Sequence, residues 1–330
     1  MVSAELAVDL DDATWDKALL ALADHNVFQG SAWARHKADA GWTARRALRL
    51  GPTGAPVAAA QLLIKRAPGG AVLWGRGGPM GDVAFWDEPL RRALATGLRA
   101  PVRYLRVCSY QDADEARRRR LAENGWKRPK RPFNPPTTFH LDLSRDEAAL
   151  EGALSSNWAH NQRRGLKRAA VRAWDDPDPE EMVAVYRAME AYKGVKAPYD
   201  AAALRSLISR LGPALRLWRA DDDSGKPVAL RACALFGDGA WDLLAASSDV
   251  GRKVYASYAL LWKLLLDCKA RGARRYDLGG ADERTAKGVF DFKKGTGAVF
   301  TEYLGEWDWA SPAPARAAVG WLISRKAAAL

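Results

Sequence analysis

The sequence predicts an α+β protein built from two domains of the same kind. Its 330 residues are enough for two domains, each with its own hydrophobic core. Both halves follow the same order of elements, namely helices, a run of antiparallel strands, a further helix and a strand. A basic, proline-rich segment at residues 127–136 (KRPKRPFNPP) separates them. We therefore expect one domain at residues 1–136 and a second at residues 137–330.

Apolar periodicity and turn residues define the elements of the first half. Trp15 and Leu19 share one face of the opening helix, Ser31 is the expected N-cap of the next helix, and Gly125 ends the last one. Turns rich in glycine and proline separate the strands. The expected helices are 13–24, 31–38, 89–100 and 113–124, and the expected strands are 44–50, 57–65, 71–74 and 104–108.

The second half repeats this order with longer helices. A polar segment at residues 221–225 reads as a hairpin turn, and Gly272 closes a long helix. The expected helices are 145–170, 180–192, 201–211 and 256–270, and the expected strands are 138–143, 214–220, 227–236, 239–247, 274–278 and 299–307.

The chain carries a formal net charge of +12, which favours anionic partners such as nucleic acid, a phosphorylated precursor or an acidic membrane surface. Codon bias in a GC-rich genome is a second explanation for part of this charge, because such genomes produce chains rich in arginine and alanine. Composition alone therefore narrows the class of partner without choosing one.

Several features favour a cytoplasmic location. The first residues contain acids and lack an apolar core, so we expect no signal peptide, and no run reaches 18 apolar residues. The cysteines Cys108, Cys233 and Cys268 are far apart in the sequence, which favours a reducing compartment over a disulfide framework. The tail at 315–330 is a basic amphipathic helix that either packs on its own domain or contacts the inner membrane surface peripherally. We expect a monomer.

The most informative pattern lies at residues 274–308 (RRYDLGGADERTAKGVFDFKKGTGAVFTEYLGEWD). Its strand ends in two glycines, which let backbone or ligand approach closely, and Asp277 before them is either a general base or a turn former. Lys293 and Lys294 follow two aromatic residues, where positive charge suits a phosphate or a developing oxyanion. The alternative is a solvated hairpin edge.

Three motifs together resemble the FemABX aminoacyltransferases, which build peptidoglycan cross-bridges. The YDLGG, FKKG and EYLGEWD elements of the pattern just described are the most specific. Residues 27–33 (VFQGSAW) look like the family's opening signature, and residues 155–169 resemble the basic helix that opens its second domain. The resemblance covers nearly the whole chain. It implies two acetyltransferase-like (GNAT) domains in tandem, without the coiled-coil arm of some members.

The resemblance implies transfer of an amino acid from aminoacyl-tRNA to an amine of a peptidoglycan precursor, or of a related peptide-like acceptor, forming an amide. The aminoacyl ester is already activated, so alignment and oxyanion stabilisation suffice, with no cofactor beyond aminoacyl-tRNA as co-substrate. By the family's motif, Phe292 and Lys293 match the phenylalanine–lysine pair of the catalytic centre. Lys293 would stabilise the transition state or the terminal tRNA phosphates, and Phe292 would shape the pocket.

The resemblance also implies an acceptor site. Lys37 matches a lysine that contacts the precursor's phosphates, Lys196 lies near the position of an arginine for the same diphosphate, and two tyrosines match aromatic positions at the start of the long helix. A surface or core role is the alternative for each of them. The residues expected to bind the acceptor are Lys37, Lys196, Tyr199, Tyr255 and Tyr258.

One departure from the family leaves the acceptor open. Members that bind the nucleotide-linked precursor carry a tyrosine pair on the strand before the long helix, whereas this chain has Asp242 followed by Leu-Leu-Ala. Two phosphate-binding hydroxyls are therefore missing. The acceptor could be a lipid-linked precursor or a different amine.

Basic residues cluster on the helix expected at 145–170, where pairs four residues apart share a face. Trp158 beside them could stack on a base. A solvated helix face is the alternative, and so is an RNA-binding protein without catalytic activity, although that class needs aromatics on an exposed sheet. The expected tRNA contacts are Arg163, Arg164, Lys167, Arg168, Arg252, Lys253 and Lys294.

The second enzymatic hypothesis is an acyl-CoA-dependent GNAT N-acyltransferase acting on a cell-envelope or small-molecule amine. Such enzymes bind the CoA pyrophosphate with a Q/R-x-x-G-x-G/A loop at a helix N-terminus. The matching segment at residues 247–255 (SSDVGRKVY) has one glycine but lacks the leading Gln or Arg and the second small residue. The loop therefore disfavours this hypothesis.

Overall fold

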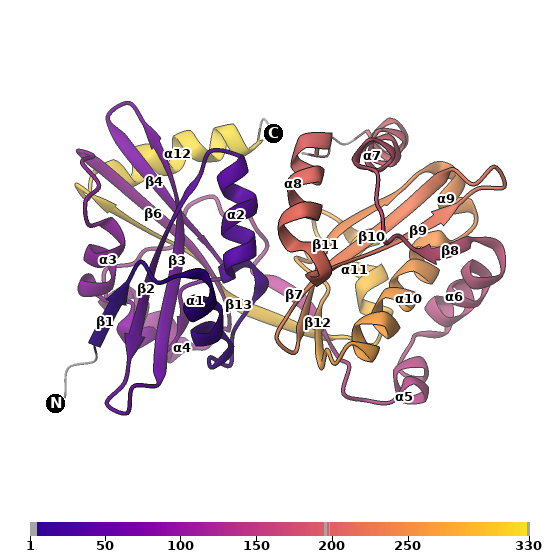
Figure 1. Cartoon of the computed structure of the whole chain (residues 1–330), viewed down its shortest axis with the longest axis horizontal. Coiled ribbons are helices and arrows are strands. Elements are labelled where there is room, and N and C mark those ends of the chain that lie inside the picture. The colour runs from indigo at the N-terminus through magenta and orange to yellow at the C-terminus, as the bar shows by residue number, and fades with distance from the viewer. Residues whose placement is uncertain (1–4, 195–196, 198, 329–330) are drawn as a thin grey trace. The chain divides into compact units, whose positions relative to one another are not determined.

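The computed structural model describes residues 5–194, 197 and 199–328, and it divides the chain into two compact units. The first unit comprises residues 1–137 and 302–330, and the second comprises residues 138–301. In Figure 1 the yellow C-terminal strand and helix lie among the indigo and purple elements of the first unit. We expected everything after residue 136 to form the second domain. Residues 302–330 depart from that expectation because their strand pairs within the first sheet.

The first unit contains a six-stranded sheet with a short additional strand. Its helices are α1 (Asp12–Leu20), α2 (Ser31–Asp39), α3 (Glu88–Ala95), α4 (Glu115–Glu123) and α12 (Ala315–Ala328). Its strands are β1 (Glu5–Val8), β2 (Thr43–Leu50), β3 (Pro56–Ala67), β4 (Gly70–Arg76), β5 (Met80–Gly81), β6 (Val102–Asp112) and most of β13 (Val299–Ser311).

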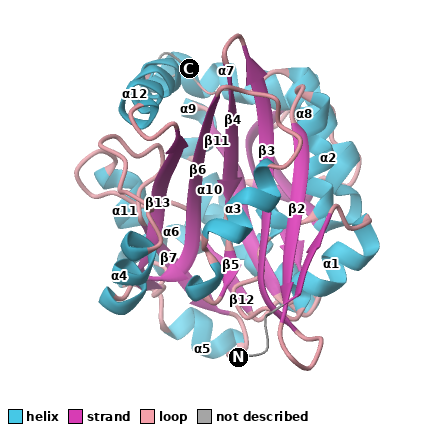
Figure 2. Cartoon of the chain, turned by 90° about the vertical axis from the view of Figure 1, so that its left-hand side faces the viewer, coloured by secondary structure: helices cyan, strands magenta, loops and turns pink. Residues whose placement is uncertain are grey.

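The strands of this sheet follow the order β1-β2-β3-β4-β6-β13, with β5 paired to β3 (Figure 2). All neighbours are antiparallel except β4 and β6, which are parallel and joined through α3. A parallel pair needs such a crossover connection, whereas short turns join the antiparallel pairs β2-β3 and β3-β4. Helix α12 then packs against β6.

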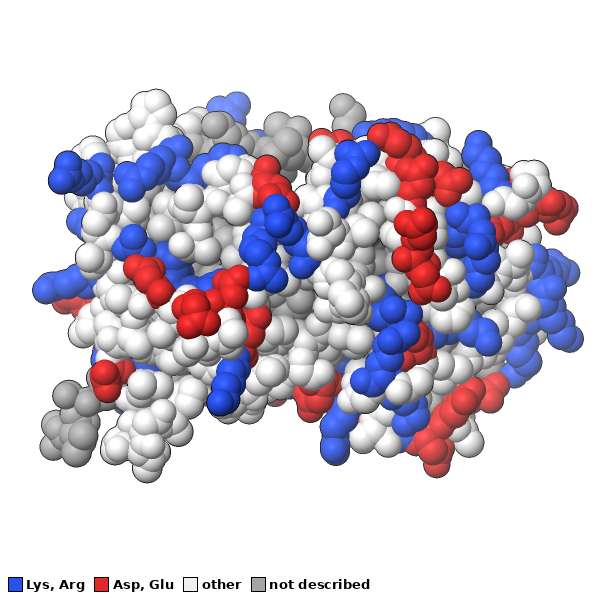
Figure 3. Space-filling model, viewed as in Figure 1, with Lys and Arg blue, Asp and Glu red and all other residues white. Residues whose placement is uncertain are grey.

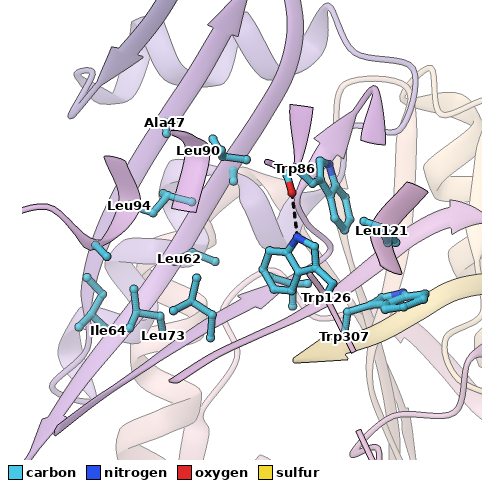
Figure 4. Close-up of a cluster of buried hydrophobic side chains, with 14 of the residues drawn as sticks. Ala47, Leu62, Ile64, Leu73, Trp86, Leu90, Leu94, Leu121, Trp126 and Trp307 are labelled. Carbon is cyan, nitrogen blue, oxygen red and sulfur yellow. Dashed lines mark hydrogen bonds between the residues drawn. The ribbon is translucent and has the colours of Figure 1, made fainter. Parts of the chain in front are cut away.

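The core of the first unit is a cluster of leucines and tryptophans between the sheet and its helices (Figure 4). The rings of Trp86 and Trp126 meet edge to face with centroids 6.3 Å apart, and the Trp126 indole N–H donates to the Trp86 carbonyl at 2.9 Å. This hydrogen bond satisfies the Trp126 indole N–H inside the core, whereas the buried Trp86 indole N–H has no partner among the described residues.

The second unit contains another six-stranded sheet. Its helices are α5 (Glu147–Gly152), α6 (Ser156–Arg168), α7 (Pro179–Lys193), α8 (Ala201–Leu211), α9 (Asp249–Lys253), α10 (Ala256–Ala270) and α11 (Lys287–Lys294). Its strands are β7 (Thr137–Asp142), β8 (Ala170–Ala173), β9 (Leu215–Asp221), β10 (Pro227–Phe236), β11 (Gly239–Ser247) and β12 (Arg275–Asp277).

The strand order β7-β12-β11-β10-β9-β8 repeats the plan of the first unit. Here β11 and β12 are the parallel pair, joined through α10, and β7 closes the end of the sheet as an antiparallel neighbour of β12. Helices α7 and α10 pack against this sheet, and α6 packs against α10. Each unit is thus an antiparallel strand run followed by one helical crossover, as the duplicated sequence pattern predicts.

Two local predictions need correction, and one alternative is excluded. The helix expected at 145–170 is two helices, because Ser155 caps a new start by accepting the Trp158 backbone N–H at 3.3 Å. Gly30, not Ser31, is the N-cap of α2, since the Ser31 hydroxyl donates to Asp16 at 2.5 Å. The FKKG segment belongs to a helix, α11, and not to a hairpin edge.

The helices described within residues 5–194 and 199–328 include none that is long and apolar enough to cross a membrane.

Candidate active site

Lys293 lies in the last turn of α11 and is 7% exposed. Its ammonium donates hydrogen bonds to the carbonyl oxygens of Gly279 at 3.0 Å and Gly280 at 2.7 Å. Burial lowers the pKa of Lys293 below its ordinary value of 10.5, an effect that the Asp242 carboxylate opposes and the Arg231 guanidinium reinforces. The lysine of the FKKG motif is therefore an interior cation beside the two glycines.

The turn that supplies these carbonyls is held by Asp277. Its Oδ1 accepts the Gly279 backbone N–H at 2.8 Å and the Thr138 hydroxyl at 2.5 Å. Gly279 has a φ of +75°, which residues with a side chain adopt only with strain. These contacts are those of a turn former, one of the two roles considered for Asp277.

A buried ion pair lies near Lys293. The guanidinium of Arg231 on β10 donates two hydrogen bonds to the carboxylate of Asp242 on β11, at 3.0 and 2.6 Å. The Tyr276 hydroxyl donates to the same carboxylate at 2.9 Å, and burial together with that negative charge raises the pKa of Tyr276. Asp242, at the position where the family's tyrosine pair is missing, thus anchors a polar network. This network was not predicted, although an arginine inside the apolar run of β10 was a signal for it.

Aromatic rings surround Phe292. Its ring centroid lies 5.0 Å from that of Tyr258 and 5.8 Å from that of Trp158, whose indole N–H donates to the Phe292 carbonyl at 3.1 Å. Trp158 is only 2% exposed. The suggestion that it stacks on a nucleic-acid base is therefore wrong, because its ring already packs on these two aromatics.

Helices α6 and α10 approach closely next to this aromatic cluster. A Cβ at Gly165 would lie 2.6 Å from the Tyr255 carbonyl oxygen, so only glycine permits this contact. The Arg164 guanidinium lies 4.1 Å from the centroid of the Tyr255 ring, and the rings of Tyr255 and Tyr258 are 6.4 Å apart. Tyr255, Tyr258 and Phe292 are thus brought together in the second unit.

The remaining basic candidates of the second unit lie on its surface. Arg163, Lys167 and Arg168 are exposed on α6, where basic side chains gather at the right-hand edge of Figure 3. Lys294 is also exposed, unlike its buried neighbour in α11. They are free to contact a polyanion from solvent.

Arg252 and Lys253 differ from the other basic candidates because an acid engages both. The Asp249 carboxylate lies 3.2 Å from the first and 2.6 Å from the second. Gly251, the residue before Arg252, is buried, and a Cβ there would lie 2.7 Å from the Val228 carbonyl oxygen. Local contacts thus engage both basic side chains of this segment, and its backbone packs closely on β10.

Lys37 lies in the first unit, on α2. Its ammonium is 4.8 Å from the centroid of the Trp33 ring, and burial, together with the positive charge of Arg76, lowers its pKa to about 8. Arg76 stacks on Phe28 at 3.7 Å and donates to the Tyr110 hydroxyl at 2.9 Å. Two cations therefore lie among aromatic rings here, an environment different from that of a fully solvated lysine.

Tyr199 packs against Tyr186. Its ring centroid lies 4.9 Å from that of Tyr186, and its hydroxyl approaches the Leu243 carbonyl at 3.5 Å. Lys196 lies outside the described residues.

Comparisons with known proteins extend this description. Residues 202–319 match the sequence profile of the FemAB family. Among solved structures, FemX is similar with a TM-score of 0.80 and 17% identity, covering 92% of this chain and 96% of FemX. A tandem GNAT protein from the clavulanic acid biosynthesis pathway matches with a TM-score of 0.55 and 14% identity, covering 93% of this chain and 98% of that protein.

A further similar structure is the C-terminal domain of a putative lysylphosphatidylglycerol synthetase from Agrobacterium fabrum, with a TM-score of 0.52 and 14% identity. It covers 90% of this chain and 92% of that domain. No curated protein matches the sequence. At these identities the structures establish the fold, which is the tandem GNAT-like α+β fold that the sequence predicts. The predicted resemblance to the FemABX family is therefore confirmed, by sequence over residues 202–319 and by fold along the described chain.

Proposed function

We propose that this protein transfers an amino acid from aminoacyl-tRNA to an amine of a peptidoglycan precursor or a related peptide-like acceptor. The family match and the FemX fold support an aminoacyltransferase of the GNAT-like superfamily. The observation that carries the proposal is the buried ammonium of Lys293, held by two backbone carbonyls directly behind Phe292.

The proposed reaction exchanges an ester for an amide. The neutral acceptor amine attacks the ester carbonyl, a C–N bond forms, and negative charge collects on the carbonyl oxygen. The C–O bond to the terminal ribose then breaks, and the proton lost by the amine ends on the released ribose hydroxyl. No covalent enzyme intermediate is required, so positioning and electrostatic stabilisation carry the catalysis.

Lys293 is suited to stabilise the transient oxyanion. An ammonium has three donors, and Gly279 and Gly280 engage two of them, which leaves one for a substrate oxygen. Its partners are neutral carbonyls, so they fix its orientation without cancelling its charge. In a site shielded from water, such a fixed charge acts more strongly than it would in solvent.

The neighbouring residues have distinct proposed roles. Phe292, the residue before Lys293, packs with Tyr258 as an aromatic wall, and Tyr255 at the start of α10 extends it. These side chains would orient the aminoacyl group and the acceptor. Lys196 and Tyr199 remain proposed acceptor contacts.

Lys37 remains the proposed contact for the precursor's phosphates. Its pKa of about 8 leaves it mostly protonated at neutral pH. A cation among aromatic rings is incompletely hydrated, so it has less hydration to lose when it binds a phosphate.

The proposed tRNA track follows the exposed basic face of α6, with Arg164 beside it and Lys294 on α11. Charges there can neutralise phosphates of an acceptor stem. Arg252 and Lys253 remain proposed contacts, but a tRNA phosphate would have to compete with the Asp249 carboxylate for them.

Local geometry weighs against the acyl-CoA hypothesis. Helix α9 has only five residues, and its N-cap serine uses its side chain to accept the Gly251 N–H at 3.2 Å. That N–H is one of the donors that a pyrophosphate would need.

A substrate panel tests the proposal. Purified protein is offered charged tRNAs and acyl-CoAs, each with lipid-linked and nucleotide-linked cell-wall precursors, and amide formation is followed by mass spectrometry. Amide formed from a charged tRNA supports the proposal. Amide formed only from acyl-CoA would replace it with the acyl-CoA hypothesis.

A further inference from the structure

A cavity of about 170 Å³ lies beneath α12, within the first unit. Arg106 and Asp308, on two neighbouring strands, form its inner wall. Helix α12 covers it from one side, and the basic segment after Trp126 borders it on another. Most residues that line the cavity lie outside the region that matches the FemAB family, and the proposed reaction gives them no role.

The inner wall holds one buried cation between two acidic side chains. Arg106 is 1% exposed and pairs with Asp308 through two hydrogen bonds of 2.8 and 3.0 Å, while Glu306 lies 3.4 Å away. The Tyr104 hydroxyl lies 2.8 Å from the same guanidinium. Bidentate pairs of this kind are strong and well ordered. Since both carboxylates engage this guanidinium, any positive charge available to a ligand comes from the rim and not from this wall.

The rim, in contrast, is positively charged. Lys130, Arg131 and Arg316 line the cavity, and none of them forms an ion pair with a residue that the structure describes. The Arg131 carbonyl accepts a hydrogen bond from Arg106 at 3.1 Å, which fixes this part of the rim. Three cations around one small cavity produce a positive electrostatic potential there, which favours the binding of an anion.

The size of the cavity restricts that anion. Pockets for drug-sized molecules measure roughly 300–1,000 Å³, so this one suits a compact group such as a phosphate. Gly320 keeps it open, because a Cβ at that position would lie 3.3 Å from the Tyr104 hydroxyl and 3.7 Å from the Asp308 carboxylate. A larger residue at this position would fill the space where α12 crosses the wall.

Next to the cavity, α12 exposes large apolar side chains. Trp321 and Leu322 are 50% and 53% exposed, whereas Ser324 on the inner side of the helix is buried. The Arg325 guanidinium lies 4.7 Å from the Trp321 ring centroid. Tryptophan beside basic residues is typical of proteins that bind at the interface of an anionic membrane. Two apolar side chains are few, so electrostatic attraction would supply most of the binding.

We propose that this cavity binds the phosphate of an anionic phospholipid headgroup and docks the first unit onto a negatively charged membrane surface. Lys130, Arg131 and Arg316 would contact the headgroup, and Trp321 and Leu322 would enter the interfacial layer. The proposal stands independently of the transfer reaction, since its cavity lies wholly in the first unit.

Vesicle co-sedimentation of the full chain tests the proposal. One set of vesicles holds equal parts of phosphatidylglycerol and phosphatidylcholine, and the other holds phosphatidylcholine alone. The triple variant Lys130→Gln, Arg131→Gln, Arg316→Gln should lose about a hundredfold in affinity for the anionic vesicles, since each basic residue near the surface contributes about a factor of five.

The matched control removes the same charge from the exposed face of α4, through Arg117→Gln, Arg119→Gln and Arg120→Gln, and should bind like the wild type. Two further variants separate the cavity from general charge attraction. The first is Gly320→Leu, which keeps every charge, and the second combines Trp321→Ala with Leu322→Ala. Each should bind the anionic vesicles more weakly than the wild type. Thermal unfolding midpoints verify that both variants are folded.

Four results would overturn the proposal. The first is wild-type binding to vesicles that contain no phosphatidylglycerol, and the second is an equal loss of affinity in the triple variant and its α4 control. The third is unchanged binding by folded Gly320→Leu. The fourth is saturable binding of inorganic phosphate by a protein that does not bind vesicles. The last result would assign the cavity to a soluble phosphate instead.

Discussion

The ammonium of Lys293 lies 2.7 Å from the carbonyl oxygen of Gly280, so the cation and the glycine turn form one unit. The carbonyls of the turn orient the lysine, while Asp242 and Asp277 act on it through their charge. An oriented but uncancelled cation is what an ester-to-amide transfer requires. The first predictions concern this arrangement.

Replacing Lys293 should change how the stability of the fold depends on pH. Burial lowers the pKa of Lys293 below 10.5, so the unfolded chain binds its proton more tightly than the folded protein does. The resulting penalty is complete at pH values below the folded pKa and disappears as the pH rises past 10.5. Lys293→Met removes this penalty, so the free energy of unfolding of the variant relative to the wild type should rise as the pH falls from 10.5 to neutral. Urea denaturation at several pH values measures this.

Lys287→Met on the same helix is the matched control for that experiment. Lys287 is exposed, and its hydrogen bond to Asp291 raises its pKa, so its effect on stability has the opposite sign. If the relative free energy of unfolding changed with pH in the same direction and by the same amount in both variants, the effect at residue 293 would not come from burial.

Asp277 should shift the pH dependence of transfer. The wild-type rate should fall as the pH rises through the folded pKa of Lys293, because the neutral amine no longer stabilises an oxyanion. The Asp277 carboxylate raises that pKa, and Asp277→Asn removes the charge while keeping an acceptor for the Gly279 N–H. We expect the basic limb of the rate profile to move to lower pH. A limb that stays in place would separate Asp277 from the lysine.

The buried pair of Arg106 and Asp308 should dominate local stability in the first unit. Both side chains are almost fully buried, at 1% and 3% exposure. Asp308→Ala leaves the guanidinium with poor compensation and should cost about 3–5 kcal/mol in the free energy of unfolding. Arg92→Ala breaks an exposed pair with Glu88 and should cost less than about 1 kcal/mol. Similar losses in the two variants would contradict this ranking.

The exposed face of α6 should govern the salt dependence of tRNA binding. Each phosphate contact removed reduces the slope of log affinity against log salt by about one. The variant Arg163→Ala, Lys167→Ala, Arg168→Ala should therefore bind charged tRNA more weakly and with a slope smaller by about three. Filter binding across a salt series measures both quantities. If the slope keeps its wild-type value, the tRNA contacts lie elsewhere.

Much of the fold could be predicted because the elements have strong local signals. The expected strands 227–236 and 239–247 and the helix 256–270 agree with β10, β11 and α10, since apolar runs and clear turns delimit them. The return of residues 302–330 to the first unit could not be predicted, because strand pairing across most of the chain leaves no local trace. The break at Ser155 in the helix expected at 145–170 was also not predicted, because serine occurs within helices as well as at their N-caps.

The candidate site was predictable in part. The FKKG motif drew attention to Lys293, but only the structure shows that the segment is helical and that the lysine bonds to the two glycines. The Arg231–Asp242 pair was missed because its partners lie out of register on neighbouring strands, with a bulge between them. Pairings of this kind depend on tertiary packing and not on spacing in the sequence.

The most direct test is single-turnover transfer from charged tRNA to an accepted precursor, comparing wild type with Lys293→Met and Lys287→Met. Removing one oxyanion donor lowers the chemical rate by about 10²–10³-fold. We predict that loss for Lys293→Met with unchanged tRNA affinity, and a wild-type rate for Lys287→Met. A wild-type rate in a folded Lys293→Met protein would contradict the account.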